Sequence, residues 1–441
     1  MSNREDVNGV AQGVAGRQRV TGVDAARGAA LVAMMAIHVL PGWNEEFEPT
    51  LTWLLFAGRG AALFALLAGV SLAFMSGGRY PPQGYRMTAM RSGIAVRAVL
   101  ITVIGLALGY LVISAQVILV YYGVMFLLSL PLLRQGVRTL LILAAAIAAA
   151  APVLMQATRD SLADTQGVEP SFSTLAAAPG DVLGQVLLSG TYPALPWMAY
   201  ICVGLAIGRL DLAARMVQIR ILVAGVGLAV VSAVLSALLM GPFGGRERLV
   251  DSASEWSSNP EETVTDILIW GPDPSLPTDS WWWFASLTPY STMPLALINT
   301  IGTSLAFLGA VLLIGKAGAA VLRPLAMLGK MTLTLYVLHL LLLASGLLEG
   351  QPRLAFMVQL AVVLLVAYVG LRFMSQGPLE RVVSDASKWV RNKYLERAQK
   401  SLPAHPSHVQ PQGSVPHVPV AYSETAAEPD ARVKRQTRRH G

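Results

Sequence analysis

Two histidines, His38 and His339, lie inside long apolar runs, and the other four histidines of the chain all follow residue 400. Imidazole changes protonation near neutral pH, so a histidine can take the proton of an attacking hydroxyl or amine, or can carry an acyl group itself. An ionisable group in lipid is costly, at least about 2.5 kcal/mol for charged residues on insertion scales, and it usually faces a polar cavity. We therefore interpret both histidines as candidate site residues, with hydrogen bonding between helices as the alternative role.

Helical spacing predicts a similar depth for the two histidines. His38 follows Arg27 by eleven residues, about 16 Å along a helix, and His339 follows Lys330 by nine residues, about 13 Å. If both helices start at the inner face of a membrane, the two imidazoles come close to the midplane. We predict a polar site between these helices.

Three more charged residues belong to the same region of the sequence. Asp24 and Arg27 are three residues apart on the helix that carries His38, so they can form an ion pair there. Arg59 lies within the next apolar run, LLFAGRGAALFALLAG, among small residues that allow helices to pack closely. A buried guanidinium needs an anionic partner such as a phosphate or a carboxylate. Arg27 alone could instead be an anchor at the inner face.

The elements that position these residues are membrane-spanning helices. The chain of 441 residues is 54% hydrophobic and 13% charged, whereas an average soluble protein has about a quarter charged residues. Apolar runs long enough for an α-helix to cross about 30 Å of hydrocarbon recur along it. We predict an all-α, polytopic membrane protein with about ten transmembrane helices around a polar midplane cavity. The spans are expected near residues 28–44, 51–75, 95–114, 116–133, 139–157, 192–208, 221–241, 292–315, 326–346 and 354–374.

Basic residues are distributed unevenly between these spans, which sets the orientation. If residue 1 is cytoplasmic, the segments on the inner side contain Arg79, Arg86, Arg91, Arg97, Arg134, Arg138, Arg209, Arg215, Arg220, Lys316, Arg323 and Lys330, and those on the outer side contain Arg159, Arg246, Arg248 and Arg353. By the positive-inside rule, both termini are cytoplasmic and the protein is a multi-pass protein of the plasma membrane. The net charge of +7 then reflects this asymmetry, and we expect the lipid bilayer and no nucleic acid as a partner.

We divide the chain into four parts. They are a cytoplasmic N-terminal tail at 1–22, a transmembrane domain at 23–382, a cytoplasmic interfacial helix at 383–400 and a disordered cytoplasmic tail at 401–441. The third and fourth spans are separated only by Ser114 and Ala115, which predicts a tight hairpin.

Two outer loops, near 158–191 and 242–291, are long enough to be lids or binding surfaces. Both are acidic, and we interpret their carboxylates, Glu169 included, as a solvated outer face. The run Trp281-Trp282-Trp283 in the second loop is interpreted as an interfacial anchor, because indole rings favour the membrane–water boundary.

Several stretches resemble a known group of membrane enzymes. RVTGVDAARGAALVAMMAIH looks like the opening of the acyltransferases related to heparan-α-glucosaminide N-acetyltransferase and to bacterial proteins of the DUF418 type. Its arginine, ten residues, histidine spacing is similar to the motif of the acyltransferase-3 family. Three later stretches resemble other segments of this transmembrane acyltransferase superfamily, so that the resemblance spans about residues 18–382. They are GRGAALFALLAGVSLAF with Arg59, SGTYPALPWMAYICVGLAIGRL with Tyr192, Pro193 and Trp197, and GKMTLTLYVLHLLLL followed by GPLE.

The resemblance implies that an acyl group, most often acetyl, moves from cytoplasmic acyl-CoA to a sugar, glycolipid or other cell-envelope acceptor outside. Acetyl-CoA or another acyl-CoA would be the co-substrate, and no metal is expected. His38 would be the catalytic base or would carry the acyl group itself. Arg27, oriented by Asp24, would hold the donor phosphate, and Arg59 would support the donor or the developing oxyanion.

Four residues are expected on the acceptor side, namely Tyr192, Trp197, Tyr290 and His339. The chain departs from the family at Tyr290, because many relatives have a histidine where it reads Pro289-Tyr290-Ser291. A tyrosine can donate a hydrogen bond there but is not a base near neutral pH.

A transporter or flippase of an envelope precursor is the alternative class, since about ten spans and a polar midplane site also suit alternating access. Against it, the sequence shows no pair of Gly- or Pro-broken helices in two matching halves. A membrane assembly factor without chemistry is a third class. Consumption of acyl-CoA distinguishes the enzyme from both.

Overall fold

The structure is a computed structural model and describes residues 20–163, 167–272, 276–315 and 318–401. Over these ranges the chain is helical, and an isolated bridge between Trp43 and Pro49 is the only β-type pairing. The predicted all-α class is confirmed. The predicted N-terminal tail, apart from its last residues, and the predicted C-terminal disordered tail from 402 onward lie outside the described residues.

The described helices fit a polytopic membrane protein. Seven are long and apolar enough to span a membrane, or nine if each of two bent pairs counts as one span, and Leu119–Arg134 is a shorter apolar helix. These numbers agree with the prediction of about ten. The two bent pairs, Pro179–Ser189 with Ala194–Gly208 and Ala319–Gly329 with Thr332–Ala344, turn by 50° and 74°.

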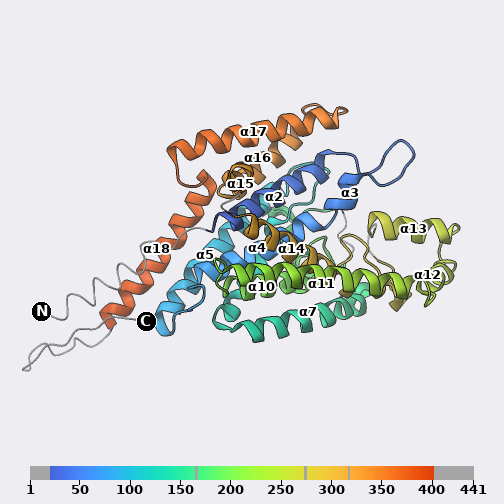
Figure 1. Ribbon diagram of the computed structural model, residues 1–441, viewed down its shortest axis with the longest axis horizontal. Coiled ribbons are helices and arrows are strands. Elements are labelled where there is room, and N and C mark those ends of the chain that lie inside the picture. The colour runs from blue at the N-terminus through green and yellow to red at the C-terminus, as the bar shows by residue number, and fades with distance from the viewer. Residues whose placement is uncertain (1–19, 164–166, 273–275, 316–317, 402–441) are drawn as a thin grey trace, which may run out of the picture. The chain divides into compact units, whose positions relative to one another are not determined.

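Figure 1 labels the main elements along the chain. The helices up to the first bent pair are α2 (Thr21–Val39), α3 (Leu51–Phe56), α4 (Arg59–Met75), α5 (Gly84–Leu108), α6 (Leu119–Ser129), η1 (Leu130–Arg134), α7 (Val137–Thr158), η2 (Arg159–Ser161), α8 (Phe172–Ala177), α9 (Pro179–Gly184) and η3 (Gln185–Ser189). The later ones are α10 (Ala194–Gly208), α11 (Arg215–Met240), α12 (Gly245–Ala253), α13 (Pro260–Trp270), η4 (Trp281–Ala285), α14 (Pro294–Ile314), α15 (Ala319–Gly329), α16 (Thr332–Ala344), α17 (Pro352–Phe373) and α18 (Pro378–Ser401).

Helix α2 is central, with α4 on one side and α15, α16 and α17 on the other (Figure 1). Glycines bring α2 and α15 into direct contact. A Cβ at Gly28 would lie 1.9 Å from the carbonyl oxygen of Leu325, and one at Gly329 would lie 1.7 Å from that of Asp24. Small residues at such crossings let helix backbones approach closely in a membrane. The contact fixes the first half of α2 beside the bend between α15 and α16.

A second glycine contact joins α4 and α10. A Cβ at Gly69 would lie 2.4 Å from the carbonyl oxygen of Ile201, and one at Gly204 would lie 2.0 Å from that of Leu66. Any larger residue at either position would separate the two helices. The contact holds the beginnings of α4 and α10 on the same side of the molecule.

The connection between α5 and α6 differs from the prediction. The expected hairpin at Ser114 and Ala115 is wrong, because α5 ends at Leu108 and α6 begins only at Leu119. The intervening segment is partly exposed, but Val117 and Ile118 at its end are buried, and side chains accept their backbone N–H groups. Helix α5 also begins eleven residues before the predicted span, at Gly84, so Arg97 lies halfway along it.

The two outer segments contain short helices. In the second segment, α12, α13 and η4 enclose a separate hydrophobic cluster that includes Leu249, Val264 and Trp283. Trp283 is only 1% exposed, so the interpretation of the whole tryptophan run as an interfacial anchor is wrong for this residue, whereas Trp281 is 62% exposed. The predicted interfacial helix at 383–400 falls within α18, which begins at Pro378.

Candidate active site

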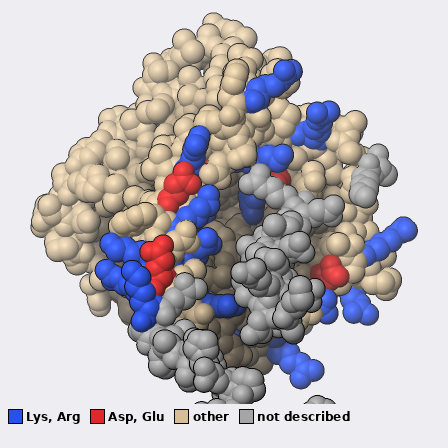
Figure 2. Space-filling view, turned by 90° about the vertical axis from the view of Figure 1, so that its left-hand side faces the viewer, with Lys and Arg blue, Asp and Glu red and all other residues tan. Residues whose placement is uncertain are grey.

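A cavity of about 470 Å³ lies between α2, α4, α5, α6, α16 and α18. We refer to it as the inner cavity, and to those at the opposite ends of these helices as the outer cavities, after the orientation predicted from the basic residues. Figure 2 views the molecule from the end at which α18 and the start of α5 lie, and lysines and arginines surround a hollow on this face. Among the residues that the structure describes, three cationic side chains line the cavity itself: Arg27, Arg97 and Lys330. A cavity of this size is typical of small-molecule sites, and its positive lining favours an anionic ligand.

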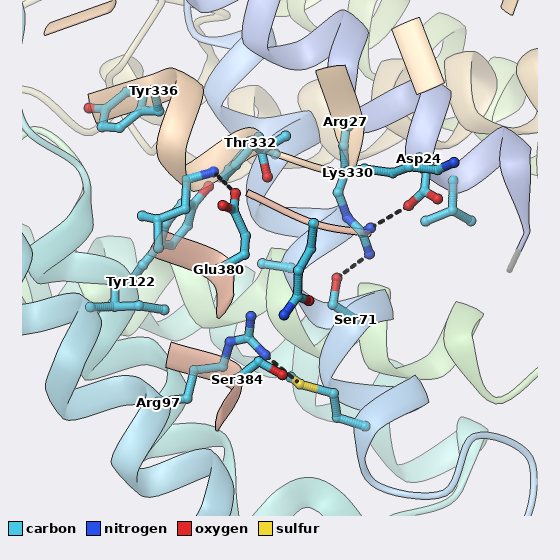
Figure 3. Close-up of a pocket in the computed structure, with 18 of the residues that line it drawn as sticks. Asp24, Arg27, Ser71, Arg97, Tyr122, Lys330, Thr332, Tyr336, Glu380 and Ser384 are labelled. Carbon is cyan, nitrogen blue, oxygen red and sulfur yellow. Dashed lines mark hydrogen bonds and ion pairs between the residues drawn. The ribbon is translucent and has the colours of Figure 1, made fainter. Parts of the chain in front are cut away.

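Arg27 extends into this cavity from the middle of α2. Its guanidinium forms the predicted ion pair with Asp24, at 2.8 Å from Nη1 to Oδ1, and it also donates to the Ser71 hydroxyl of α4 (Figure 3). Asp24 and Ser71 orient the guanidinium without closing the cavity, because all three residues line it. A planar guanidinium held in this way is suited to bind phosphate oxygens.

Arg97 is a second guanidinium in the cavity, which the sequence analysis did not select. It extends from the middle of α5, and Nη1 contacts the Met75 sulfur at 3.1 Å (Figure 3). Arg97 is within electrostatic range of both Arg27 and Glu380. The signal was present in the stretch IAVRAVLITV, which has apolar residues on both sides of the arginine, but the span was predicted to begin beside it.

The bend between α15 and α16 adds the third cation. Lys330 lies at this bend, and α16 begins two residues later at Thr332. Glu380 of α18 accepts hydrogen bonds from the backbone N–H groups of Leu333 and Thr334 at 2.6 and 3.2 Å. Since backbone N–H groups at a helix start have no partner within the helix, this carboxylate caps α16 and ties α18 to the wall of the cavity.

The deep end of the inner cavity is aromatic and apolar, with Phe64, Ile118, Tyr122 and Tyr336 in its lining. Among the described residues, the Tyr122 hydroxyl has no hydrogen-bond partner although it is buried. The Tyr336 oxygen accepts the N–H of Ile118 at 3.4 Å, so its own hydrogen is available to a ligand. Two hydroxyls can therefore bind polar groups of a ligand that enters past the cations.

Two outer cavities of about 260 Å³ each meet at Tyr290 and Thr292, which line both. The lining of one includes Arg59, Trp197 and Tyr290, three of the predicted site residues. Arg59 is the first residue of α4, beyond a break in the second span, and its guanidinium donates to the carbonyl oxygen of Leu54. The structure thus places Arg59 away from Arg27, in the outer cavity.

Two other features mark these outer cavities. Tyr290 and Thr292 have φ angles of +58° and +56°, a left-handed conformation that is uncommon for residues other than glycine and rare for β-branched ones. Such strain is frequent at functional sites. The indole nitrogen of Trp197 is buried without a hydrogen-bond partner among the described residues, while Tyr192 packs edge-on against the Trp197 ring from behind.

The two intramembrane histidines, which helical spacing predicted at a similar depth, are in direct contact. His38 Nδ1 lies 3.0 Å from His339 Nε2, and His339 Nδ1 lies 2.7 Å from the Gln359 carbonyl oxygen Oε1. Because this oxygen can only accept, His339 Nδ1 carries a hydrogen, and a neutral His339 then accepts from His38 Nδ1. This arrangement leaves His38 Nε2 unprotonated, the form that a base requires.

The histidine pair is one helical turn beyond the inner cavity. On α2 the last cavity-lining residue is Met34, four positions before His38, and on α16 it is Tyr336, three positions before His339. Residues at these spacings share a helix face. Neither histidine lines the inner or the two outer cavities within the described part of the chain.

A thin wall separates the inner cavity from one outer cavity. Ile118 lines the inner cavity and Gln116 lines the outer one, so the segment 116–118 has a different cavity on each side. The backbone N–H of Val117, between these two residues, donates to Glu169 Oε2 at 3.2 Å. Burial raises the pKa of Glu169 to about 7, although the Val117 hydrogen bond opposes this shift. We refer to residues 116–118, Tyr336 and Glu169 as the partition.

Glu169 is the second residue that sequence reasoning missed. It was included with the solvated carboxylates of an acidic loop, and nothing in its local sequence, QGVEPS, separates it from them. Only the tertiary fold, which turns this loop inward against residues 116–118, identifies it.

The comparison with protein families agrees with this arrangement. Residues 19–236, just short of half of the chain, match the family described as heparan-alpha-glucosaminide N-acetyltransferase, catalytic. No curated protein matches the chain. The predicted resemblance to this family is confirmed, while the arginine–histidine motif of the acyltransferase-3 family stays a prediction. With the apolar helices, the match supports a membrane acetyltransferase.

Proposed function

From the match to an acetyltransferase catalytic domain, we propose that the protein transfers an acyl group, in the first place acetyl, from cytoplasmic acyl-CoA to a sugar acceptor on the outer side of the plasma membrane. One observation carries this proposal. A cation-lined cavity and a polar outer cavity approach each other at the partition, where Ile118 lines the first and Gln116 lines the second. A donor from one side and an acceptor from the other can meet there without either crossing the membrane.

The inner cavity suits coenzyme A. Arg27, Arg97 and Lys330 supply the positive charge that a diphosphate and a ribose phosphate require. The Tyr122 hydroxyl, which has no partner among the described residues, can bind an amide group of the pantetheine arm. The pantetheine arm is long and neutral, so the apolar deep end of the cavity is a better place for it than the charged mouth. The thioester would then reach Tyr336.

The outer cavities suit a sugar acceptor. Their polar lining includes Gln116, Gln185 and Thr191 in one cavity and Asn299 and Thr300 in the other. The buried indole nitrogen of Trp197 can donate to a sugar hydroxyl, and indole and phenol rings pack well against the apolar faces of sugars. The matched family acts on an α-glucosaminide, so an amino sugar, free or carried on a glycolipid, is the first acceptor to test.

The roles of individual residues are part of the proposal. Arg27 with Asp24 binds donor phosphate, and Arg59, Trp197, Tyr290 and the buried Tyr192 behind them form the acceptor side. The assignment of His38 as the base, supported by His339, stays a prediction that rests on its unprotonated Nε2 and on its place just beyond the inner cavity. If His38 is the base, His38→Ala should abolish transfer and leave acetyl-CoA binding intact, and if another group accepts the proton, His38→Ala should retain transfer.

The test of the function uses the purified full chain in nanodiscs with acetyl-CoA and methyl α-glucosaminide. We expect free coenzyme A thiol and acetylated glucosaminide in equal amounts, the sugar product being identified by mass spectrometry. The N-acetylated glucosaminide, offered as a second acceptor, distinguishes amide from ester formation. If acetyl-CoA is not consumed with any sugar acceptor, the protein is not an acyltransferase.

The structure also contains a feature that favours the transporter class. The two bent helix pairs, one in each half of the chain, are the discontinuous helices that the sequence analysis did not find, and such helices often bind substrates in transporters. The same assay separates the classes, because a transporter moves a labelled glucosaminide into proteoliposomes without consuming acetyl-CoA.

The orientation is tested separately. A cysteine at the exposed Ser258, in the outer segment, should react with an impermeant thiol reagent in intact cells, and one at the exposed Ser375, beside α18, should react only after lysis. The native Cys202 is fully buried and gives little background. The reverse pattern would place the cationic cavity outside and remove the cytoplasmic donor from the proposal.

A further inference from the structure

We infer that Glu169 of the partition is the group that receives the acceptor's proton during acyl transfer. The inference rests on the proposed function and names Glu169, in place of His38, as the base for that reaction. Its carboxylate binds the backbone of the three-residue wall that both substrates would approach from opposite sides.

The loop that carries Glu169 is held rigidly against this wall. On one side of it, the Gln185 side chain donates to the Val168 carbonyl oxygen at 2.8 Å. On the other side, the Pro170 carbonyl packs against Gly109, where a Cβ would lie 2.1 Å from the oxygen. A side chain other than hydrogen at Gly109 would therefore displace the loop. Catalytic groups are effective when neighbouring contacts fix their positions in this way.

Only one oxygen of the Glu169 carboxylate accepts a hydrogen bond from the described residues. This hydrogen bond comes from Val117 and reaches Oε2. Val168 and Tyr336, which neighbour Glu169, line an outer cavity and the inner cavity, and in the proposed reaction Oε1 accepts a proton from a ligand held between them. The titratable groups within electrostatic range are the tyrosines 121, 192 and 336, which are neutral near pH 7, and Arg159 lines the adjacent outer cavity. A base is most effective when its pKa lies near the working pH, a condition that the raised pKa of Glu169 meets.

Tyr336 is the second residue of the partition to which we assign a role in the reaction. Its oxygen and Glu169 Oε2 accept hydrogen bonds from the successive N–H groups of Ile118 and Val117, which places the two side chains next to each other. The Tyr336 hydroxyl hydrogen is free to donate to the thioester carbonyl oxygen, on which negative charge develops during the attack.

The step balances with the substrates alone. The acceptor oxygen or nitrogen forms a bond to the thioester carbonyl carbon, and its proton moves to the Glu169 carboxylate. The bond from this carbon to sulfur then breaks, and the proton passes to the leaving thiolate, which yields free coenzyme A and regenerates the carboxylate. No oxidant, metal or further reactant is needed.

The test compares Glu169→Gln with wild type and with Asp181→Asn, which removes an exposed carboxylate from the same outer segment. Glu169→Gln should lower kcat for transfer from acetyl-CoA to methyl α-glucosaminide by about 10²–10⁴-fold and leave acetyl-CoA affinity unchanged. Asp181→Asn should behave as wild type. In wild type, kcat should rise with pH up to about 7 and then level off, because only the ionised carboxylate is a base.

A second variant covers the case in which Glu169→Gln does not fold. Glu169→Ala leaves space at the partition, and added formate should restore part of its activity, which a purely structural carboxylate would not allow. Wild-type turnover in Glu169→Gln, or a wild-type rate that does not change between pH 5.5 and 8, would overturn the inference while leaving acyl transfer intact. Absence of transfer by the wild type would instead overturn the proposed function and this inference with it.

Discussion

The inner cavity and the outer cavities are built from different parts of the chain. The inner one is enclosed mainly by long helices that glycine contacts hold in place, and the charged residues in the described part of its lining are three cations and two carboxylates. The outer ones are formed largely by helix ends and connecting segments, two residues of which have strained backbones. Loops can vary without disturbing a helical core, so this division suits one constant ligand inside and a family-specific ligand outside.

The family match follows the same division. It covers α2 to most of α11, which includes Arg27, Arg97 and Glu169, and it ends before the outer lobe of α12, α13 and η4. Substitutions in the partition should therefore reduce kcat. Substitutions in the inner cavity should weaken the binding of the donor, and those in the outer cavities should weaken the binding of the acceptor. Each prediction below tests one part of this separation.

After substitution of the candidate bases His38 and Glu169, the largest loss of kcat is expected for substitution of Tyr336. Tyr336→Phe removes one hydrogen-bond donor to the developing oxyanion and should lower kcat by about 10²–10³-fold with little change in acetyl-CoA affinity. Tyr394→Phe, on the exposed face of α18, is the matched control. If Tyr336→Phe changes only the donor affinity, Tyr336 belongs to the inner cavity and not to the partition.

The inner cavity is tested at Arg97. Arg97→Met removes a cation whose hydrogen bond to an anion contributes about 1.5–3 kcal/mol, so the Kd for acetyl-CoA should rise roughly 10- to 100-fold while kcat at saturating donor changes little. Arg86→Met, an exposed position on the same helix, should leave the Kd unchanged. Equal donor affinity in both variants would show that Arg97 does not face the donor.

The outer cavity is tested at Trp197. Trp197→Phe keeps an aromatic ring and loses the indole N–H, a neutral donor that contributes about 0.5–1.5 kcal/mol, so the acceptor KM should rise roughly 2- to 10-fold at unchanged donor KM. Trp281→Phe, at an exposed outer position, serves as the comparison. A change in the donor KM instead would show that the outer cavity does not bind the acceptor alone.

The smallest effect concerns stability and pH. Folding raises the pKa of Glu169 from 4.5 to about 7 because burial disfavours the charge, so its contribution to stability is present below about pH 4.5 and is lost as the pH rises to 7. The melting temperature of wild type in detergent should fall across this window by roughly 2 °C more than that of Glu169→Gln. Parallel curves for the two proteins would mean that the carboxylate is hydrated in the folded state.

The sequence was sufficient for those parts of the site that depend on spacing along one helix. The ion pair of Asp24 and Arg27 and the similar depth of His38 and His339 both follow from helical geometry and span direction, whereas the direct contact of the two histidines depends on how α2 packs against α16. The sequence could not separate Arg59 from Arg27, because a break before α4 places Arg59 at the start of a new helix in the outer cavity.

The residues that were missed depend on contacts between distant segments. Arg97 was counted with the inner anchors because an apolar pattern does not mark where α5 begins, eleven residues before the predicted span. Glu169 is recognisable only when its loop contacts Gly109 and Val117, about fifty residues earlier in the chain. Hydrophobic periodicity contains no information about such pairings.

The thin partition has an electrical consequence. In the proposed reaction the acceptor's proton starts outside and ends on the coenzyme A thiol inside, while the acyl group leaves that sulfur and moves outward in exchange. The charge on each side is the same before and after a turnover, whereas moving a full charge across a membrane potential of 100 mV would correspond to about 2.3 kcal/mol. The rate of acetylation in proteoliposomes should therefore be the same with an inside-negative potential as after this potential is collapsed with valinomycin and potassium.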